Sequence, residues 1–323
     1  MNIVVAGAGG FIGGHLTKKL IADGHSVIAI DIKKPEDWFQ HGKGDTQEVC
    51  GDLREPEIAR YFLPKADRVY NLACNMGGMG FIQNNHVDCL ESVAIQTNLI
   101  RAIRSLGENG PKEIFYSSSA CAYPQEIQSR LNSTSLKESD AIPANPEDGY
   151  GWEKLFSEII TQYAEKDCDL NPRIARFHNC YGPFGTWKGG REKAPAAICR
   201  KVIEAKLSGK HEIEIWGDGK QKRSFMYIDD CITGIEKIWE SNYTQPLNLG
   251  SDEQVSINQL VDITEEIADI KLKRKYDPSK PQGVRGRNSD NTLIKKVTGW
   301  APSIPLEEGM QKTYDWIYEQ MTS

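Results

Sequence analysis

The stretch GAGGFIG, residues 7–13, decides the fold of this 323-residue chain. It follows an apolar run at residues 2–6 that is typical of a strand, and it leads into a helical pattern at residues 11–23. Its spaced glycines permit a tight turn and let backbone amides and a helix N-terminus approach a pyrophosphate. Any turn from a strand to a helix favours glycine, so the stretch alone indicates a dinucleotide site only weakly.

An acidic residue strengthens that indication. Asp31 ends a second predicted strand at residues 26–30, about 20 residues after Gly10. Its carboxylate can accept hydrogen bonds from both ribose hydroxyls of NAD and would repel the 2′-phosphate of NADP, although Lys33 and Lys34 follow it. We therefore expect NAD as the cofactor. Asp52, after a third strand, either contacts the adenine edge or only caps a loop.

Strand and helix patterns alternate through the first half of the chain. Such alternation predicts an α/β fold of the Rossmann type, with a doubly wound parallel sheet. The further strands are expected at residues 68–72, 113–117 and 172–177, and the helices include residues 98–106 and 152–163.

Beyond about residue 176 the elements become short and irregularly spaced, which predicts a smaller C-terminal α/β substrate lobe. We expect an NAD-binding domain at residues 1–175 and a substrate lobe at residues 176–323, with some chain crossing back. The elements expected in the second lobe are a helix at 192–207, strands at 213–216 and 223–228, a helix from Asp229, and a last amphipathic helix at 306–318.

Composition excludes several classes of protein. The 39 Lys+Arg against 45 Asp+Glu give a net charge of −6, which offers little support for binding nucleic acid or a membrane surface. No run reaches the roughly 18 apolar residues of a membrane span, and no signal peptide is apparent, so we expect a cytoplasmic protein. The eight cysteines form no CxxC pair. Neither a metal site nor disulfides are expected.

A tyrosine and a lysine mark the expected chemistry. Tyr150 and Lys154 are four residues apart, hence on one face of a helix. The lysine can lower the proton affinity of the phenol and can hold a cofactor ribose, so the tyrosine can act as general acid and base on a sugar hydroxyl. The preceding strand ends in three serines, residues 117–119, which can hydrogen-bond the same hydroxyl.

These motifs resemble those of the extended short-chain dehydrogenase/reductase superfamily, whose members act on nucleotide-diphosphate sugars. Longer strings narrow the resemblance to the GDP-mannose 3,5-epimerases, over essentially the whole chain. These strings are NMGGMGF at 75–81, SSAC at 118–121, RFHNCYGPFGTWKGGREKAP at 176–195 and GVRGRNSDN at 283–291. The resemblance implies conversion of GDP-D-mannose to GDP-L-galactose, with GDP-L-gulose as a further product.

Such a reaction needs transient oxidation at C4, because a C4 ketone makes the C–H bonds at C3 and C5 acidic. Tyr150 with Lys154 would serve the C4 hydroxyl. The resemblance implies that Cys121 and Lys193 move the carbon-bound protons on opposite faces of the sugar. A thiol suits this work because nearby cations favour its thiolate.

The expected site falls into two groups. The cofactor-binding residues are Gly7, Gly10, Phe11, Ile12, Gly13, Asp31, Asp52, Leu72, Tyr150 and Lys154. The residues expected to bind the nucleotide sugar are Gly77, Ser119, Ala120, Cys121, Asn179, Glu192, Lys193, Lys201, Gln221, Arg223 and Arg287. Lys201 and the two arginines are the expected cations for the diphosphate. His178 and Trp187 are assigned no catalytic role.

One departure and several alternatives remain open. Cys74-Asn75 stands where Ala-Asp is expected of the epimerases, which leaves the base and the sugar, hexose or heptose, undecided. A 4-epimerase would leave Cys121 and Lys193 idle, and a 4,6-dehydratase would place an Asp-Glu pair after the serines. A non-catalytic NAD sensor would commonly lack Tyr150.

The superfamily also implies a homodimer. Apolar residues in the segment 90–103, together with the outer face of the Tyr150 helix, would form a four-helix bundle between two copies. A monomer core would give the same pattern.

Overall fold

The computed structural model describes residues 1–323, except for the side chain of Lys65. Its main feature is a seven-stranded sheet with the order β11-β6-β5-β4-β1-β2-β3, in which every pairing is parallel. The strands are β1 (Asn2–Ala6), β2 (Ser26–Asp31), β3 (Thr46–Cys50), β4 (Arg68–Asn71), β5 (Glu113–Ser119), β6 (Asn171–Phe177) and β11 (Leu247–Leu249). The predicted doubly wound parallel α/β fold is confirmed.

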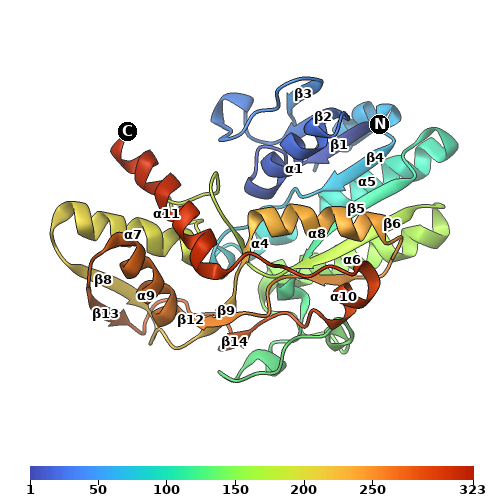
Figure 1. Ribbon diagram of the computed structural model, residues 1–323. Helices are drawn as coiled ribbons and strands as arrows, with labels where there is room; N and C mark the ends of the chain where they lie inside the picture. The colour runs from blue at the N-terminus through green and yellow to red at the C-terminus, as the bar shows by residue number, and fades with distance from the viewer.

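Helices cover both faces of this sheet (Figure 1). On one face lie α1 (Phe11–Ala22) and α8 (Ile228–Glu240), and on the other lie α2 (Pro56–Phe62), α5 (Val93–Leu106) and α6 (Asp148–Asp167). Successive residues of β1 alternate between the two layers: Ile3 and Val5 pack with α1 and α8, and Val4 and Ala6 pack with the other three helices. The sheet is therefore buried on both sides.

The smaller lobe is built from three longer helices and three small sheets. The helices are α7 (Ala194–Ser208), α9 (Ile257–Ala268) and α11 (Leu306–Thr322), with α10 (Thr292–Thr298) nearby. The sheets pair β8 (Glu212–Trp216) with β13 (Lys273–Asp277), β9 (Lys222–Ser224) with β12 (Gln254–Ser256) and β14 (Gly286–Arg287), and β7 (Cys180–Tyr181) with β10 (Met226–Tyr227).

Short helices occupy the connections. They are α3 (Met79–Ile82), α4 (His86–Leu90) and the 3₁₀ turns η1 (Pro35–Asp37), η2 (Leu63–Lys65), η3 (Gly107–Asn109), η4 (Ala120–Ala122), η5 (Glu126–Gln128) and η6 (Glu138–Ala141). The turn η4 follows β5 directly, so the residues after the serine strand lie at the carboxyl edge of the large sheet, where parallel α/β folds bind ligands.

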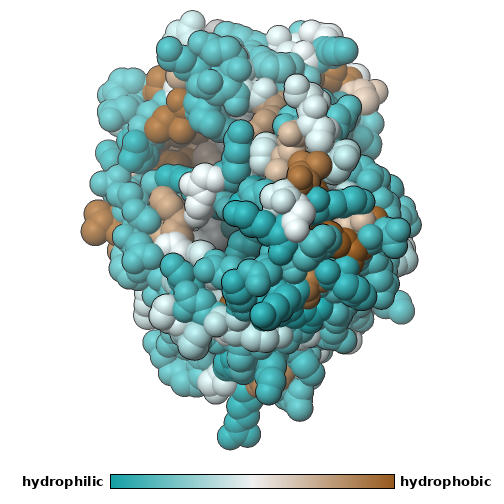
Figure 2. Space-filling model, turned by 90° about the vertical axis from the view of Figure 1, so that its left-hand side faces the viewer, coloured by the Kyte–Doolittle hydropathy of each residue, from teal (hydrophilic) through white to brown (hydrophobic). Residues whose placement is uncertain are grey.

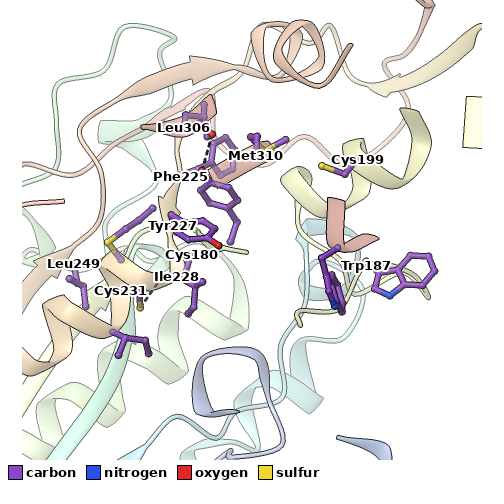
Figure 3. Close-up of a cluster of buried hydrophobic side chains, with 14 of the residues drawn as sticks. Cys180, Trp187, Cys199, Phe225, Tyr227, Ile228, Cys231, Leu249, Leu306 and Met310 are labelled. Atoms are coloured by element: carbon purple, nitrogen blue, oxygen red, sulfur yellow. Dashed lines mark hydrogen bonds between the residues drawn. The ribbon is translucent and has the colours of Figure 1, made fainter. Parts of the chain in front are cut away.

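One hydrophobic core joins the two lobes. It runs from the α1 and α8 face of the large sheet into α7, α9 and α11. Cys180 and Cys231 point toward each other within it (Figure 3), and their sulfurs lie 3.4 Å apart as free thiols. The lobes are thus fixed to one another by shared apolar packing.

The strand expected at residues 223–228 is wrong as a single element. The chain forms β9, then turns so that the backbone N–H of Met226 donates to Asn179 O at 3.2 Å, and β10 joins a different small sheet. Helix α8 already begins at Ile228. The helix expected at residues 98–106 is longer, because α5 begins at Val93.

The expected domain division at residues 175 and 176 stays a prediction. This point lies inside β6, and α8 and β11 return from the later chain to pack on or join the large sheet. Residues 228–249 of the later chain therefore return to the large sheet.

The outer surface is mostly polar on the face that carries α7 and α11. Hydrophobic residues occur there in small separate groups around a hollow (Figure 2). Within the described part of the chain, no helix is both long enough and apolar enough to cross a bilayer.

Candidate active site

A cavity of about 280 Å³ lies between the carboxyl edge of the large sheet and the smaller lobe. Its walls come from the ends of β5 and β6, from α6, and from α7, β8, β9 and β14 of the smaller lobe. All of the residues expected to bind a nucleotide sugar line it, together with Tyr150. Sequence segments far apart in the chain thus meet at one place, while the role of each residue remains a prediction.

The glycine stretch forms a close-packed cradle before α1. Gly7 has φ of +83°, and its N–H donates to Ile30 O at 2.8 Å. A Cβ added to Gly13 would lie 2.0 Å from Gly7 O, so no side chain fits there. Phe11 and Ile12 open α1 beside this turn, and Leu72 follows β4 next to it. This geometry fits a pyrophosphate approached by backbone groups.

Asp31 ends β2 next to the cradle and is 8% exposed. Burial raises the pKa of its carboxyl, although the backbone N–H of Lys33 donates to it at 2.9 Å. Asp52 accepts hydrogen bonds from the backbone and the guanidinium of Arg54, which lowers the pKa of Asp52. The loop-capping role of Asp52 is therefore observed, and its contact with an adenine stays a prediction.

Lys154 is a buried ammonium with donors to spare. It is 1% exposed, and its Nζ lies 5.5 Å from the centre of the Tyr150 ring. Its one ion pair is with Glu153, at 3.3 Å, and among the described residues it has no hydrogen-bond partner. Tyr116 and Ser157 donate to the other carboxylate oxygen of Glu153, at 3.1 and 3.0 Å. Unused donors on a buried cation fit the hydroxyls of a cofactor ribose.

The pKa of the Tyr150 phenol depends on Lys154, as expected, but burial has the larger effect on it. Desolvation raises the pKa of its phenol well above the ordinary value, and Cys74 and Cys121 act in the same direction. Lys154 lowers it, as the sequence predicts, yet only in part. Burial also tends to lower the pKa of Lys154, but Cys74, Glu153 and Tyr150 more than offset this and raise it.

The three serines at the end of β5 face different surroundings. Ser117 donates to Asn71 O at 2.9 Å and Ser118 donates to Glu158 at 2.9 Å, so both point into the protein. Ser119 lines the cavity, and its Oγ accepts from the backbone N–H of Cys121 at 3.1 Å. Only Ser119 of the three is therefore placed to contact a sugar.

Cys121 and Lys193 lie on different walls of the cavity. Cys121 belongs to η4 at the edge of the large sheet, and its sulfur accepts from Arg287 at 3.2 Å. Lys193 is the N-cap residue of α7 in the smaller lobe. Its ammonium makes no hydrogen bond or ion pair with any residue that the structure describes, which leaves it available to a ligand.

The expected diphosphate cations differ in their partners. Arg223 is 9% exposed and donates only to the carbonyls of Lys222 and Gln282, at 2.8 and 3.2 Å. Burial and then the charge of Arg287 lower the pKa of Arg223 to about 9. Lys201 donates to Glu214 O at 2.9 Å. Arg223 is thus a buried cation facing the cavity that no carboxylate contacts, which favours an anionic ligand.

The neutral residues are held by the backbone around them. Asn179 has φ of +45°, and its amide donates to Ser224 O at 3.1 Å. Gln221 donates to Trp216 O at 3.0 Å, and its own oxygen has no partner among the described residues. The acidic Glu192 differs from them: its carboxylate accepts from the backbone N–H of Gly190 at 2.7 Å and from the guanidinium of Arg200 at 3.0 Å, so it links its own loop to α7.

Sequence reasoning missed several contacts at this site. Arg191 donates to Asn75 at 2.8 Å and covers the ring of Phe81, which ties the loop before Lys193 to the loop at residues 75–81. Glu147 pairs with Arg287. No local pattern could reveal these partners, because they are more than 100 residues apart.

His178 and Trp187 are both buried in the interior. Burial lowers the pKa of His178 to about 3, and its Nε2 lies 2.9 Å from Asn248. His178 is not among the described residues that line the cavity. Among the described residues, no group of three or more His, Cys, Asp or Glu is arranged to hold a metal ion.

Residues 3–250 match the model of the NAD dependent epimerase/dehydratase family. The chain is 48% identical to GDP-mannose 3,5-epimerase of Arabidopsis thaliana, over 99% of this chain and 83% of that protein. It is 47% identical to GDP-mannose 3,5-epimerase 1 of Oryza sativa subsp. indica, over 99% of this chain and 82% of that protein. This chain belongs to the NAD dependent epimerase/dehydratase family.

Solved structures of epimerases and related proteins share the fold. UDP-glucose 4-epimerase from Thermotoga maritima, with UDP-glucose, matches with a TM-score of 0.87 and 23% identity, over 99% of this chain and 100% of that one. MoeE5 in complex with UDP-glucuronic acid and NAD matches with a TM-score of 0.83 and 25% identity, over 99% and 100%. As a member of this family, the chain is an NAD-dependent enzyme, and the cradle, Asp31 and Lys154 are the residues that fit NAD.

Proposed function

We propose that this chain is a GDP-mannose 3,5-epimerase, which forms GDP-L-galactose and, by inversion at C5 alone, GDP-L-gulose. The observation that carries the proposal is the placement of Cys121 and Lys193 on different walls of the cavity that also contains Tyr150. Relatives that are 47% and 48% identical over nearly the whole chain bear this name. A cavity built for hydride transfer alone would not need the thiol and the amine.

The first step serves the C4 hydroxyl of the sugar. Tyr150, as the phenolate, takes the hydroxyl proton, and the adjacent ammonium of Lys154 stabilises the phenolate. Ser119 can hydrogen-bond the same oxygen. NAD, when bound, supplies the acceptor for the C4 hydride and later returns it. Oxidation at C4 leaves a ketone between C3 and C5.

The second step inverts the neighbouring carbons. The thiolate of Cys121 takes a proton from carbon, so that an S–H bond forms, the C–H bond breaks and the electron pair passes into the ketone as an enolate. Lys193 donates a proton to the same carbon from the opposite face, and the ketone is restored. Proton exchange with solvent then restores the thiolate of Cys121 and the ammonium of Lys193, and the same two transfers invert the second carbon. Return of the hydride to C4 and of the proton from Tyr150 to the C4 oxygen gives the product.

The remaining walls suit the nucleotide. Arg223 supplies a buried, unpaired positive charge for the diphosphate. Apolar and aromatic residues of β8 and the segment before β14, among them Ile215, Trp216 and Pro281, line the part of the cavity formed by the smaller lobe. A flat heterocycle packs favourably on such a surface. The proposed substrate is therefore GDP-mannose, in preference to a free sugar.

A Cys121→Ser variant tests the assignment against a sugar 4-epimerase. With GDP-mannose in deuterated water, the variant should still build up absorbance of the reduced cofactor, because Tyr150 and Lys154 are intact. It should lose deuterium uptake at C3 and C5 by about 10²-fold or more. A 4-epimerase would be nearly unaffected by the change. Absence of both signals in the wild-type protein would support a non-catalytic NAD-binding protein.

A homodimer forms part of the proposal. Trp152, Phe156, Ile159 and Tyr163 are exposed by 37–64% and follow one face of α6. Val87 and Leu90 of α4, which packs beside α6, extend this apolar face. Ile100 and Ile103 of α5 do not contribute, because they lie in the core of the single chain.

A second copy is the natural occupant of this face, because a two-fold axis would pair α6 with itself. Sedimentation should show a dimer, and Phe156→Glu should convert it into a monomer without unfolding it. A wild-type monomer at micromolar concentration would contradict the dimer.

We also propose a cytoplasmic location, since all eight cysteines are free thiols. Cell fractionation tests it, and enrichment in a secretory fraction would contradict it.

A further inference from the structure

The side chain of Arg287 is buried between a thiol and a carboxylate. One terminal nitrogen donates to the sulfur of Cys121 at 3.2 Å, and the other donates to the carboxylate of Glu147 at 3.1 Å. Its Nε donates to Gln128. Arg287 and Glu147 are each 5% exposed at their side chains. The guanidinium is thus committed to a thiol and a carboxylate, both inside the protein.

Three separate segments supply these groups. Cys121 comes from η4, Glu147 is the N-cap residue of α6, and Arg287 ends β14 of the smaller lobe. Tyr150 of α6 and Arg223 of β9 are the other ionisable groups whose charges interact with that of Cys121, and Lys193 before α7 lines the same cavity. Burial and, to a smaller degree, the charge of Arg287 lower the pKa of His178. Among the described residues, Glu147 is the carboxylate that touches the guanidinium.

We propose that Glu147 is a positioning residue that sets the basicity of Cys121 through Arg287. Arg287 brings a positive charge to the sulfur and makes the thiolate available. Glu147 holds the guanidinium in place and partly neutralises it, so that the thiolate is not stabilised to the point of being a poor base. This inference rests on the proposed role of Cys121.

The balance matters because the base must remove a proton from carbon. The strength of a base and the stability of its charged form oppose each other, so a thiolate under the full charge of an arginine would be abundant but weak. A carboxylate on the far side of the arginine moderates that charge while keeping the fork of hydrogen bonds. Arg287 then belongs to the hexose end of the cavity, and Arg223 becomes the principal cation for the diphosphate.

The test compares three variants of the full-length protein by iodoacetamide alkylation of Cys121, followed by peptide mass spectrometry from about pH 6 to pH 9. Glu147→Gln keeps a hydrogen-bond acceptor for Arg287 but removes the negative charge, so alkylation at pH 7 should be several-fold faster than in the wild type. Arg287→Met removes the positive charge and should slow alkylation by about tenfold. Glu113→Gln, which loses a partly exposed pair with Arg68 at 2.6 Å outside the cavity lining, should leave alkylation unchanged.

A second measurement distinguishes an effect of Glu147 on the basicity of Cys121 from a purely structural role of Glu147. Glu147→Gln should lower the rate of deuterium exchange at C3 and C5 of saturating GDP-mannose at about pH 9, where the thiolate is formed in both proteins and only its strength as a base differs. Glu147→Asp keeps the charge but withdraws it from the guanidinium, so it should shift alkylation in the same direction as Glu147→Gln, by less. This variant serves as the test if Glu147→Gln does not fold.

Two outcomes overturn the inference: no change in alkylation in either variant, or changes of the same sign in Glu147→Gln and Arg287→Met. Failure of the proposed function is distinct, because it appears as absent exchange in the wild-type protein whatever the alkylation rates.

Discussion

Two buried arginines, Arg176 of the large sheet and Arg223 of the smaller lobe, differ in the groups that accept their hydrogen bonds. Arg176 lies on β6 of the large sheet and donates to Glu158 through two nitrogens, at 3.0 and 2.5 Å. Arg223 lies on β9 of the smaller lobe and meets only two backbone carbonyls. The pKa of Arg176 is raised because Glu158 outweighs its burial, whereas burial lowers that of Arg223 to about 9.

The difference teaches which charges serve the fold and which await a ligand. On the large sheet, Glu158 neutralises Arg176, whereas the buried Arg173 of the same strand meets only amide and carbonyl oxygens within the chain. The wall of the smaller lobe keeps Arg223 and Lys193 without carboxylates, at the expense of stability. Such cations mark the half of the cavity that receives the anionic part of a substrate.

The largest expected effect is on the free energy of unfolding, through the buried pair of Arg176 and Glu158. Arg176→Met would leave Glu158 buried without its cation, and this should lower the free energy of unfolding by about 3–5 kcal/mol. Denaturant unfolding measures it, and the double variant Arg176→Met/Glu158→Leu should recover most of the loss. A loss as small as that of an exposed pair would break the comparison.

The matched substitution at Arg223, which has no carboxylate partner, should affect binding of GDP instead of stability. Arg223→Met should weaken binding of GDP by about 2–3 kcal/mol, or roughly 30- to 150-fold, because a charged hydrogen-bond donor is lost. The free energy of unfolding should stay the same or rise, since a buried charge without a partner is removed. Calorimetric titration and unfolding together check this. Equal damage to stability in Arg176→Met and Arg223→Met would show that both arginines are structural.

The pH dependence of kcat/KM tests the influence of Lys154 on the phenol of Tyr150. The pKa of Tyr150 is raised by burial and lowered in part by Lys154, so the phenolate fraction grows about tenfold per pH unit below that pKa. Lys154→Met removes the lowering influence, so the profile of kcat/KM should move to higher pH, with the greatest loss at neutral pH. An unshifted profile would mean that Lys154 acts only on the cofactor.

The smallest effect comes from an exposed pair in the smaller lobe. Lys312 and Glu308 lie 2.7 Å apart with side chains 46% and 52% exposed. Lys312→Met should leave the free energy of unfolding almost unchanged, because solvent screens the pair. Denaturant unfolding of Lys312→Met and Arg176→Met under the same conditions shows whether the burial of an ion pair, more than its presence, determines its contribution to stability. A loss of several kcal/mol would contradict that view.

The sequence was most informative where the signal is local. The glycine stretch, Asp31 and the spacing of Tyr150 and Lys154 follow from the geometry of one turn or one helix, and the structure has all of them at the carboxyl edge of the sheet. The seven-stranded order adds β11, which follows a helix that returns from the later chain. Its three residues gave no strand pattern of their own.

Long-range contacts were beyond prediction from the residues alone. Arg287 and Cys121 touch although 166 positions separate them. Nothing in the run around Glu147 indicates an arginine partner. The error at residues 223–228 has the same origin, because the contact of Met226 with Asn179 divides an apparently continuous strand.

The most direct measurement of the central claim is NMR of GDP-mannose incubated with the enzyme in deuterated water. The account predicts deuterium at both C3 and C5 of the hexose, none at C4, and loss of both labels in Lys193→Met. Conversion of the sugar with no deuterium at C3 or C5 would contradict it, because hydride transfer at C4 would then be the whole reaction.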